Sequence, residues 1–138
     1  MTIEMAGNFT REMKSLPHVL DLVENFFAKA KLQKDDRYPI ELAVEEVFTN
    51  FVEHNSSGSD GISIRIRRDG GLVSIVLTDY DAPLFDVTKD APQPPINAPL
   101  ADREPGGLGL HLVRKMMDTI VYKHENGAGT VLLSKSVG

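Results

Sequence analysis

The spacing of hydrophobic positions changes along the chain and separates helical segments from extended ones. Between residues 17 and 31 apolar side chains recur three or four positions apart, which predicts a helix with Pro17 in its first turn. The same spacing between residues 38 and 54 predicts a second helix. The polar residues 34–36 are expected to separate the two helices, and Asn55 to Gly58 should end the second one.

After residue 60 the hydrophobic spacing becomes two, which is typical of strands. Residues 62–67 alternate between isoleucine and polar side chains, residues 69–71 form a turn signal, and residues 72–78 are apolar enough for a central strand. Two further strands are expected at residues 119–124 and 130–134, joined by a turn at Asn126 and Gly127. A weaker alternation at residues 8–13 is interpreted as a first strand.

Residues 86–105 interrupt this pattern. The segment contains five of the eight prolines, at positions 92, 94, 95, 99 and 105, and we expect a long loop that acts as a lid. A third helix is expected from about Leu110 to Met117. The resulting order predicts an α+β, two-layer α/β sandwich: one domain over residues 1–138, with helices on one face of a mostly antiparallel, mixed sheet.

Composition narrows the classes of function. The 138 residues are 41% hydrophobic, enough for one core, and they include no cysteine, so disulfides and thiol nucleophiles are excluded. The net charge of −5 and the scattered basic residues argue against a nucleic-acid partner. No apolar run approaches the length of a membrane span, and no leader pattern is recognised, so we expect a cytoplasmic protein.

Three segments contain candidate site residues. On the second helix, Glu46 and Asn50 lie one turn apart at one border of the apolar face, whereas Glu45 projects to the other side. Such a pair can face a cleft, although an ordinary charged helix flank has the same pattern. Asp79 ends the most apolar strand, where its carboxylate could accept a bond from an exocyclic amine or simply form a turn.

The third segment is the glycine-rich run Gly106-Gly107-Leu108-Gly109-Leu110 before the third helix. Glycines let backbone N–H groups approach a phosphate, and a helix N-terminus favours an anion. The run is neither a P-loop nor a dinucleotide fingerprint, because the lysine of the first and the framing strand and acidic residue of the second are missing.

In order and spacing, these segments resemble the N, G1 and G2 boxes of the GHKL ATPases, with Glu-x-x-x-Asn, Asp-x-x-x-Pro ending at Pro83, and Gly-Gly-Leu-Gly-Leu. The short length and the sequences at residues 41–50, 79–86 and 105–114 resemble the serine/threonine kinases that act as bacterial anti-sigma factors. The resemblance extends over residues 9–134 and implies the histidine-kinase-like, Bergerat-type ATP-binding fold.

The resemblance also implies roles for individual residues. Asn50 would be the ligand of the Mg²⁺ that bridges the phosphates of ATP, Asp79 would bind the adenine amino group, and Gly107 and Gly109 would wrap the phosphates. Glu46 would be the general base that takes the proton from a serine or threonine hydroxyl of a partner protein. The expected partner is an anti-anti-sigma (STAS-type) protein, with a sigma factor and a second copy of the chain as further candidates.

The sequence departs from the family pattern at one position. Asp81 stands where the G1 box normally has glycine, which adds a negative charge beside the expected nucleotide. This substitution keeps open a second hypothesis, a module whose affinity for a protein is regulated by ATP without phosphoryl transfer. His54, His111 and Arg114 lie near the same boxes, but each has an ordinary structural explanation at the end or surface of a helix.

Overall fold

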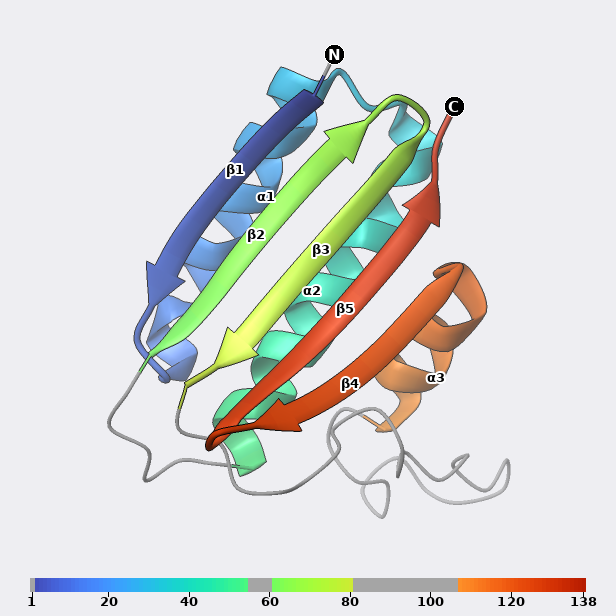
Figure 1. The fold of residues 1–138 in the computed structure, drawn as a ribbon. Coiled ribbons are helices and arrows are strands. Elements are labelled where there is room, and N and C mark those ends of the chain that lie inside the picture. The colour runs from blue at the N-terminus through green and yellow to red at the C-terminus, as the bar shows by residue number, and fades with distance from the viewer. Residues whose placement is uncertain (1, 55–60, 81–106) are drawn as a thin grey trace.

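The computed structural model describes residues 2–54, 61–80 and 107–138; the side chains of residues 107–109 lie outside that description. Five strands form one sheet in the order β1-β2-β3-β5-β4 (Figure 1). Their bounds are β1 Thr2–Phe9, β2 Ile62–Asp69, β3 Leu72–Asp79, β4 Thr119–Glu125 and β5 Ala128–Ser136. All four described strand pairings are antiparallel. Among the described strands the sheet is therefore antiparallel, and not the mixed sheet that had been expected from the sequence.

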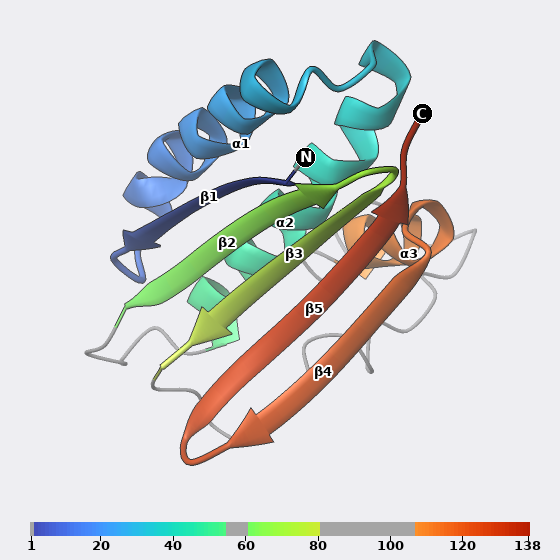
Figure 2. The same ribbon diagram turned by 45° about the horizontal axis from the view of Figure 1, so that its top comes forward.

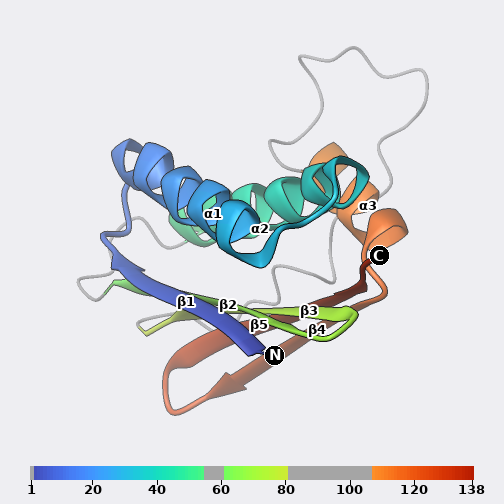
Figure 3. The ribbon, with the colours of Figure 1, turned by 90° about the horizontal axis from the view of Figure 1, so that it is seen from above.

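The helices cover one face of the sheet and leave the other face open (Figures 2 and 3). They are α1 Leu16–Ala30, α2 Lys34–His54 and α3 Gly107–Met116, with a short 3-10 turn, η1 Met13–Ser15, before α1. The predicted two-layer α+β sandwich is therefore confirmed. The cause is the period-two pattern of the strands, which gives the sheet one apolar face for the helices to cover.

The core lies between the two layers. The apolar side chains that recur at helical spacing along α2 are all buried: Ile40, Ala43, Val44, Val47, Phe48 and Phe51. They meet inward side chains of β2, β3 and β5 such as Ile64, Ile75 and Leu133, each at most 2% exposed. Burying this apolar surface is the main force that holds helices and sheet together.

Three predicted boundaries differ from the structure by three residues or more. The first strand is Thr2–Phe9, not residues 8–13, because Ile3, Met5 and Phe9 alternate inward along the edge of the sheet. Helix α2 begins at Lys34 rather than residue 38, and Asp35 and Asp36 suit its first turn because carboxylates there face the positive end of the helix dipole. Helix α3 begins at Gly107 rather than Leu110, so Gly107 and Gly109 belong to its first turn.

Candidate functional site

The predicted site residues belong to elements that end on one side of the molecule. The C-terminal end of α2, the end of β3 and the start of α3 all lie at the same end of the sheet (Figure 1). Helix α2 packs directly against α3 and against β3. The fold therefore brings together the elements that contain Asn50, Asp79 and the described part of the glycine run.

Asn50 occupies a buried position on the last turns of α2. Its side chain is only 3% exposed, and Nδ2 donates a hydrogen bond of 2.7 Å to the backbone carbonyl of Glu46, one turn earlier. A buried asparagine must satisfy its polar atoms to avoid a desolvation cost. Because this bond uses the amide NH₂ group, the oxygen Oδ1 is the end that remains for a cation or another donor.

Glu46 lies on the same border of α2, one turn before Asn50. Its atom Oε2 is buried and has no hydrogen-bond partner within the part of the chain that the structure describes. Burial raises the pKa of the Glu46 carboxyl above its usual value of 4.5, and the negative charges of Glu45 and Glu53 raise it further. A carboxyl group in this environment is a stronger base than one in water, which is a property of functional sites.

Asp79 points into the molecule from the end of β3. It continues the inward positions of Val73, Ile75 and Leu77, and it is 1% exposed. Its carboxylate is paired with Arg11, which lies just after β1: Nε donates to Oδ2 at 3.3 Å and Nη2 donates to Oδ1. Arg11 was not predicted from the sequence. A buried carboxylate such as that of Asp79 needs a cationic partner, but its position in the strand does not identify which basic residue is that partner.

The glycine run is described only in part. Gly107, Leu108 and Gly109 form the first turn of α3, where backbone N–H groups have no partner within the helix. Leu110 follows and is 4% exposed, so its side chain packs inward and any contact to a ligand would come through its backbone. Gly106, Pro83, Asp81 and the lid expected at residues 86–105 lie outside the described residues.

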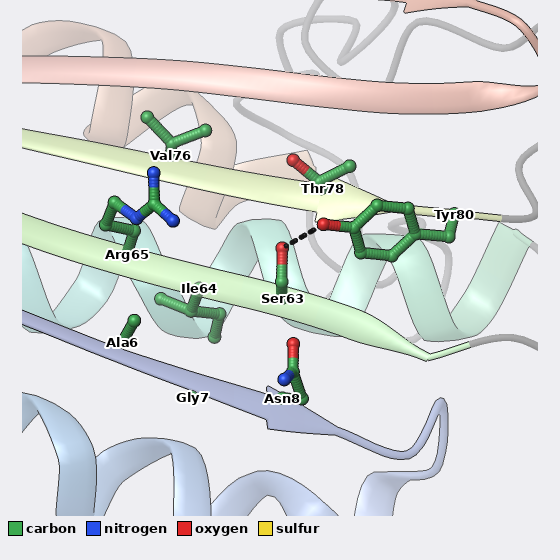
Figure 4. Close-up of a pocket in the computed structure, with 9 residues that line it drawn as sticks. All are labelled: Ala6, Gly7, Asn8, Ser63, Ile64, Arg65, Val76, Thr78 and Tyr80. Atoms are coloured by element: carbon green, nitrogen blue, oxygen red, sulfur yellow. Dashed lines mark hydrogen bonds between the residues drawn. The ribbon is translucent and has the colours of Figure 1, made fainter.

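The remaining candidates lie at the margins of this region. His54 ends α2 with an exposed side chain, His111 is partly buried on α3, and Arg114 is exposed on the last turn of α3. A hollow of about 410 Å³ on the open face of the sheet is a separate feature, with Tyr80 hydrogen-bonded to Ser63 across it (Figure 4). It lies on the face of the sheet that the helices do not cover and contains none of the predicted site residues.

The donor atoms near Asn50 suit magnesium in their chemistry. Mg²⁺ prefers oxygen ligands and keeps several waters, so one amide oxygen and the phosphates of a nucleotide form a normal set. The buried oxygen of Glu46 that lacks a partner lies one turn from that amide. Within residues 2–54, 61–80 and 107–138, no three histidine or acidic side chains gather into a metal cage of the protein's own.

An antiparallel sheet with helices on one face, in which α2 packs against both β3 and α3, agrees with the two-layer fold expected of the GHKL ATP-binding class. Residues 9–135 match the family described as the histidine kinase-like ATPase domain. The chain belongs to this family, as the resemblance in the sequence predicted.

Curated relatives and a solved structure agree with this assignment. The chain is 32% identical over 97 residues to the serine-protein kinase RsbW of Halalkalibacterium halodurans, covering 67% of this chain and 59% of that protein. It is 31% identical over 93 residues to the serine/threonine-protein kinase BtrW of Bordetella bronchiseptica, covering 66% of this chain and 64% of that protein. The chain thus spans less than two thirds of the length of both relatives.

The solved structure is a crystal structure of the RsbU and RsbW domains of a Mycobacterium tuberculosis protein. It matches 98% of this chain and 32% of that chain with a TM-score of 0.71 and 16% sequence identity. This likeness shows the fold. A separate finding concerns membranes: among the described residues, no helix has both the length and the apolar character needed to cross a bilayer.

Proposed function

We propose that this protein is a cytoplasmic ATP-dependent serine/threonine protein kinase of the anti-sigma-factor type. Its substrate would be a serine or threonine hydroxyl of an anti-anti-sigma (STAS-type) protein, and a sigma factor would be a second partner. Membership in the histidine kinase-like ATPase family and the relatives named as serine-protein kinases support the proposal.

The observation that carries the proposal is the pair of Glu46 and Asn50 on α2. The Glu46 carboxyl has a raised pKa and a buried oxygen without a partner among the described residues, and the Asn50 amide is buried one turn away. A helix flank that only solvates charge would expose both groups to water instead. The pair therefore fits a base beside a ligand for the nucleotide's cation.

In this proposal each candidate site residue has a role either in phosphoryl transfer or in nucleotide binding. Glu46 accepts the proton of the attacking hydroxyl, whose oxygen forms the new bond to the γ-phosphorus while ADP departs. Asn50 is the candidate ligand for Mg²⁺, which when bound neutralises charge on the phosphates. The N–H groups of Gly107, Leu108 and Gly109 in the first turn of α3, with Gly106 before them, hold the phosphates. Asp79 accepts a hydrogen bond from the adenine amino group, and Pro83 and Leu110 complete the binding boxes.

A second function is supported by Asp81 alone. The added carboxylate in the G1 box would weaken ATP binding or transfer and leave a module whose affinity for a protein partner depends on ATP. The two functions differ in one observable. Both bind ATP, but only the kinase phosphorylates the partner.

The test has two steps. First, ATP with Mg²⁺ should raise the Tm of the wild-type protein, because a ligand that binds only the folded state stabilises it by about 2.7 kcal/mol at a hundredfold excess over Kd. Second, labelled ATP and a cognate anti-anti-sigma (STAS-type) protein should yield a phosphorylated partner. Glu46→Gln should reduce the transfer rate at least a hundredfold, because general-base catalysis contributes about that much.

Glu45→Gln is the matched control, since it removes a neighbouring carboxylate that projects to the other side of α2. This variant should still phosphorylate the partner at pH 8. A Glu46→Gln protein that transfers phosphate as fast as wild type would remove Glu46 as the base. ATP binding without transfer by the wild type favours the regulatory module, and no Tm shift with ATP rejects both functions.

A further inference from the structure

The ion pair of Arg11 and Asp79 is buried at the site end of the sheet. Both side chains are 1% exposed, and the two residues are 68 positions apart in the sequence. Phe9, Ile62 and Asp79 lie side by side across β1, β2 and β3, so the chain after β1 turns directly past the end of β3. The fold brings Arg11 to the carboxylate through this register.

The segment that contains Arg11 is itself fixed. Thr10 Oγ1 is hydrogen-bonded to Ser15 Oγ, and the Glu12 N–H donates to the carbonyl of Thr10 at 2.8 Å. Ser15 is buried at the start of α1. These bonds join the end of β1 to α1, so Arg11 projects from a closed turn rather than from a free loop.

The geometry of the pair orients the carboxylate. Two different nitrogens of one planar guanidinium donate to the two oxygens of Asp79, which fixes the plane of the carboxylate. A carboxylate has about four acceptor positions, and the guanidinium occupies one on each oxygen. The pairing with Arg11 therefore does not by itself exhaust the capacity of the carboxylate to accept hydrogen bonds, and an amino group is a donor of the kind that a carboxylate accepts.

Burying this ion pair carries a desolvation cost that apolar side chains at the same position would not have. Replacing a buried ion pair with apolar side chains of similar volume is often neutral or stabilising, because two charges must otherwise leave water. The inward positions that precede Asp79 on β3 are the apolar residues Val73, Ile75 and Leu77. A charged residue at the end of this series, with its own arginine, indicates a role in recognition rather than in packing.

We propose that Arg11 is a positioning residue for base recognition: it holds Asp79 as an oriented anion that accepts the exocyclic amino group of adenine. The inference rests on the proposed function, in which Asp79 binds ATP. Guanine presents an oxygen at the position where adenine presents this amino group, so an oriented anion there favours adenine. Arg11 does not touch the nucleotide and acts through Asp79.

The test compares Arg11→Gln with the wild type in affinity for ATP and for tripolyphosphate, measured by calorimetry with Mg²⁺. Arg11→Gln should weaken ATP binding about tenfold or more, because hydrogen bonds to charged groups have effects of this size. Affinity for tripolyphosphate should not change, since that probe has no base. Arg11→Lys, which keeps the charge but lacks the planar fork, should lose about threefold.

Arg65→Gln is the matched control. Arg65 also forms an ion pair, with Glu4 at 3.3 Å, but that pair is exposed on the open face of the sheet. This variant should bind ATP as the wild type does. Circular dichroism establishes that each variant is folded at the temperature of measurement.

The outcomes separate this inference from the proposed function. A wild type that does not bind ATP rejects the proposed function and this inference with it. A wild type that binds ATP, beside a folded Arg11→Gln that binds equally well, overturns the inference alone. Equal losses for ATP and tripolyphosphate also overturn it, because they indicate general damage. If Arg11→Gln does not fold, Arg11→Lys decides by the same comparison.

Discussion

At the scale of single residues, the candidate site contains a carboxyl group, that of Glu46, whose burial is unfavourable for folding. The folded protein raises the pKa of Glu46 through burial and through Glu45 and Glu53, which means that it binds the Glu46 proton more tightly than the unfolded chain does. Burial and the neighbouring carboxylates both oppose the negative charge of the ionised Glu46 carboxyl. Strained or costly groups of this kind concentrate where function requires them.

Glu46→Gln should therefore raise the Tm at pH 7 to 8. Because the folded-state pKa is raised, the destabilising effect develops as the pH rises from about 4.5 through the folded-state pKa, and it is absent at lower pH. The gain from Glu46→Gln should accordingly disappear below pH 4.5. Thermal unfolding of the variant and the wild type between pH 4 and 8 measures this difference in Tm.

Asp118 provides a control of opposite sign. The backbone N–H of Ser136 donates to its carboxylate at 2.6 Å and lowers the pKa of Asp118 below 3.8. Asp118→Asn should thus lower the Tm at neutral pH, and its effect should shrink as the pH falls through the folded-state pKa. If both variants shift the Tm in the same direction at pH 7, the electrostatic explanation is wrong.

At the scale of elements, the turns set the strand register. The turn between β2 and β3 contains Gly70 with φ of 60°, and the turn between β4 and β5 contains Asn126 and Gly127 with φ of 53° and 79°. Most residues other than glycine and asparagine are disfavoured at positive φ, because their Cβ meets the backbone there. The turn residues thus agree with the antiparallel register on either side of them.

Gly70→Ala should lower the free energy of unfolding by about 1–2 kcal/mol, the cost of a left-handed conformation for a residue with a Cβ. An added Cβ would meet nothing within 4 Å, so the cost is conformational and not steric. Gly71→Ala is the matched control in the same turn, because Gly71 has no positive φ and its Cβ would meet only Val137 O at 3.5 Å. Urea unfolding should leave Gly71→Ala within about 1 kcal/mol of wild type. Equal losses would contradict the explanation.

At the scale of the whole molecule, stability depends on one face of the sheet. Ile75 and Val76 are neighbours on the central strand β3, but Ile75 is fully buried under the helices and Val76 lines the hollow on the open face (Figure 4). A two-layer protein concentrates its apolar burial on the covered side.

Ile75→Ala should lower the free energy of unfolding by about 2–5 kcal/mol, because it removes buried methylenes and leaves a cavity. Val76→Ala should lower it by less than about 1 kcal/mol, as expected for a partly exposed position. Guanidinium unfolding at 25 °C compares the two directly. A Val76→Ala loss as large as that of Ile75→Ala would mean that the open face is covered in solution.

Most of the fold was predictable because it depends on local periodicity. The period of 3.6 in α1 and α2, the period of two in β2 and the apolar run of β3 gave the type and order of these elements. The errors were at boundaries, as with β1, where the alternation of Ile3 and Met5 is decided by pairing with β2. Glu46 and Asn50 were predicted from the border of an apolar helix face and Asp79 from the end of an apolar strand, and the roles of all three stay predictions.

By itself, the sequence determined the family, the order of elements and the candidate residues Glu46, Asn50 and Asp79, because these depend on spacing along one segment at a time. Only the tertiary structure decided that Arg11 is the partner of Asp79 and that the Glu46 carboxyl is partly buried. A contact between residues 68 positions apart follows from the register of three strands, and burial follows from what packs above a helix. Neither property can be read from the segment that contains the residue.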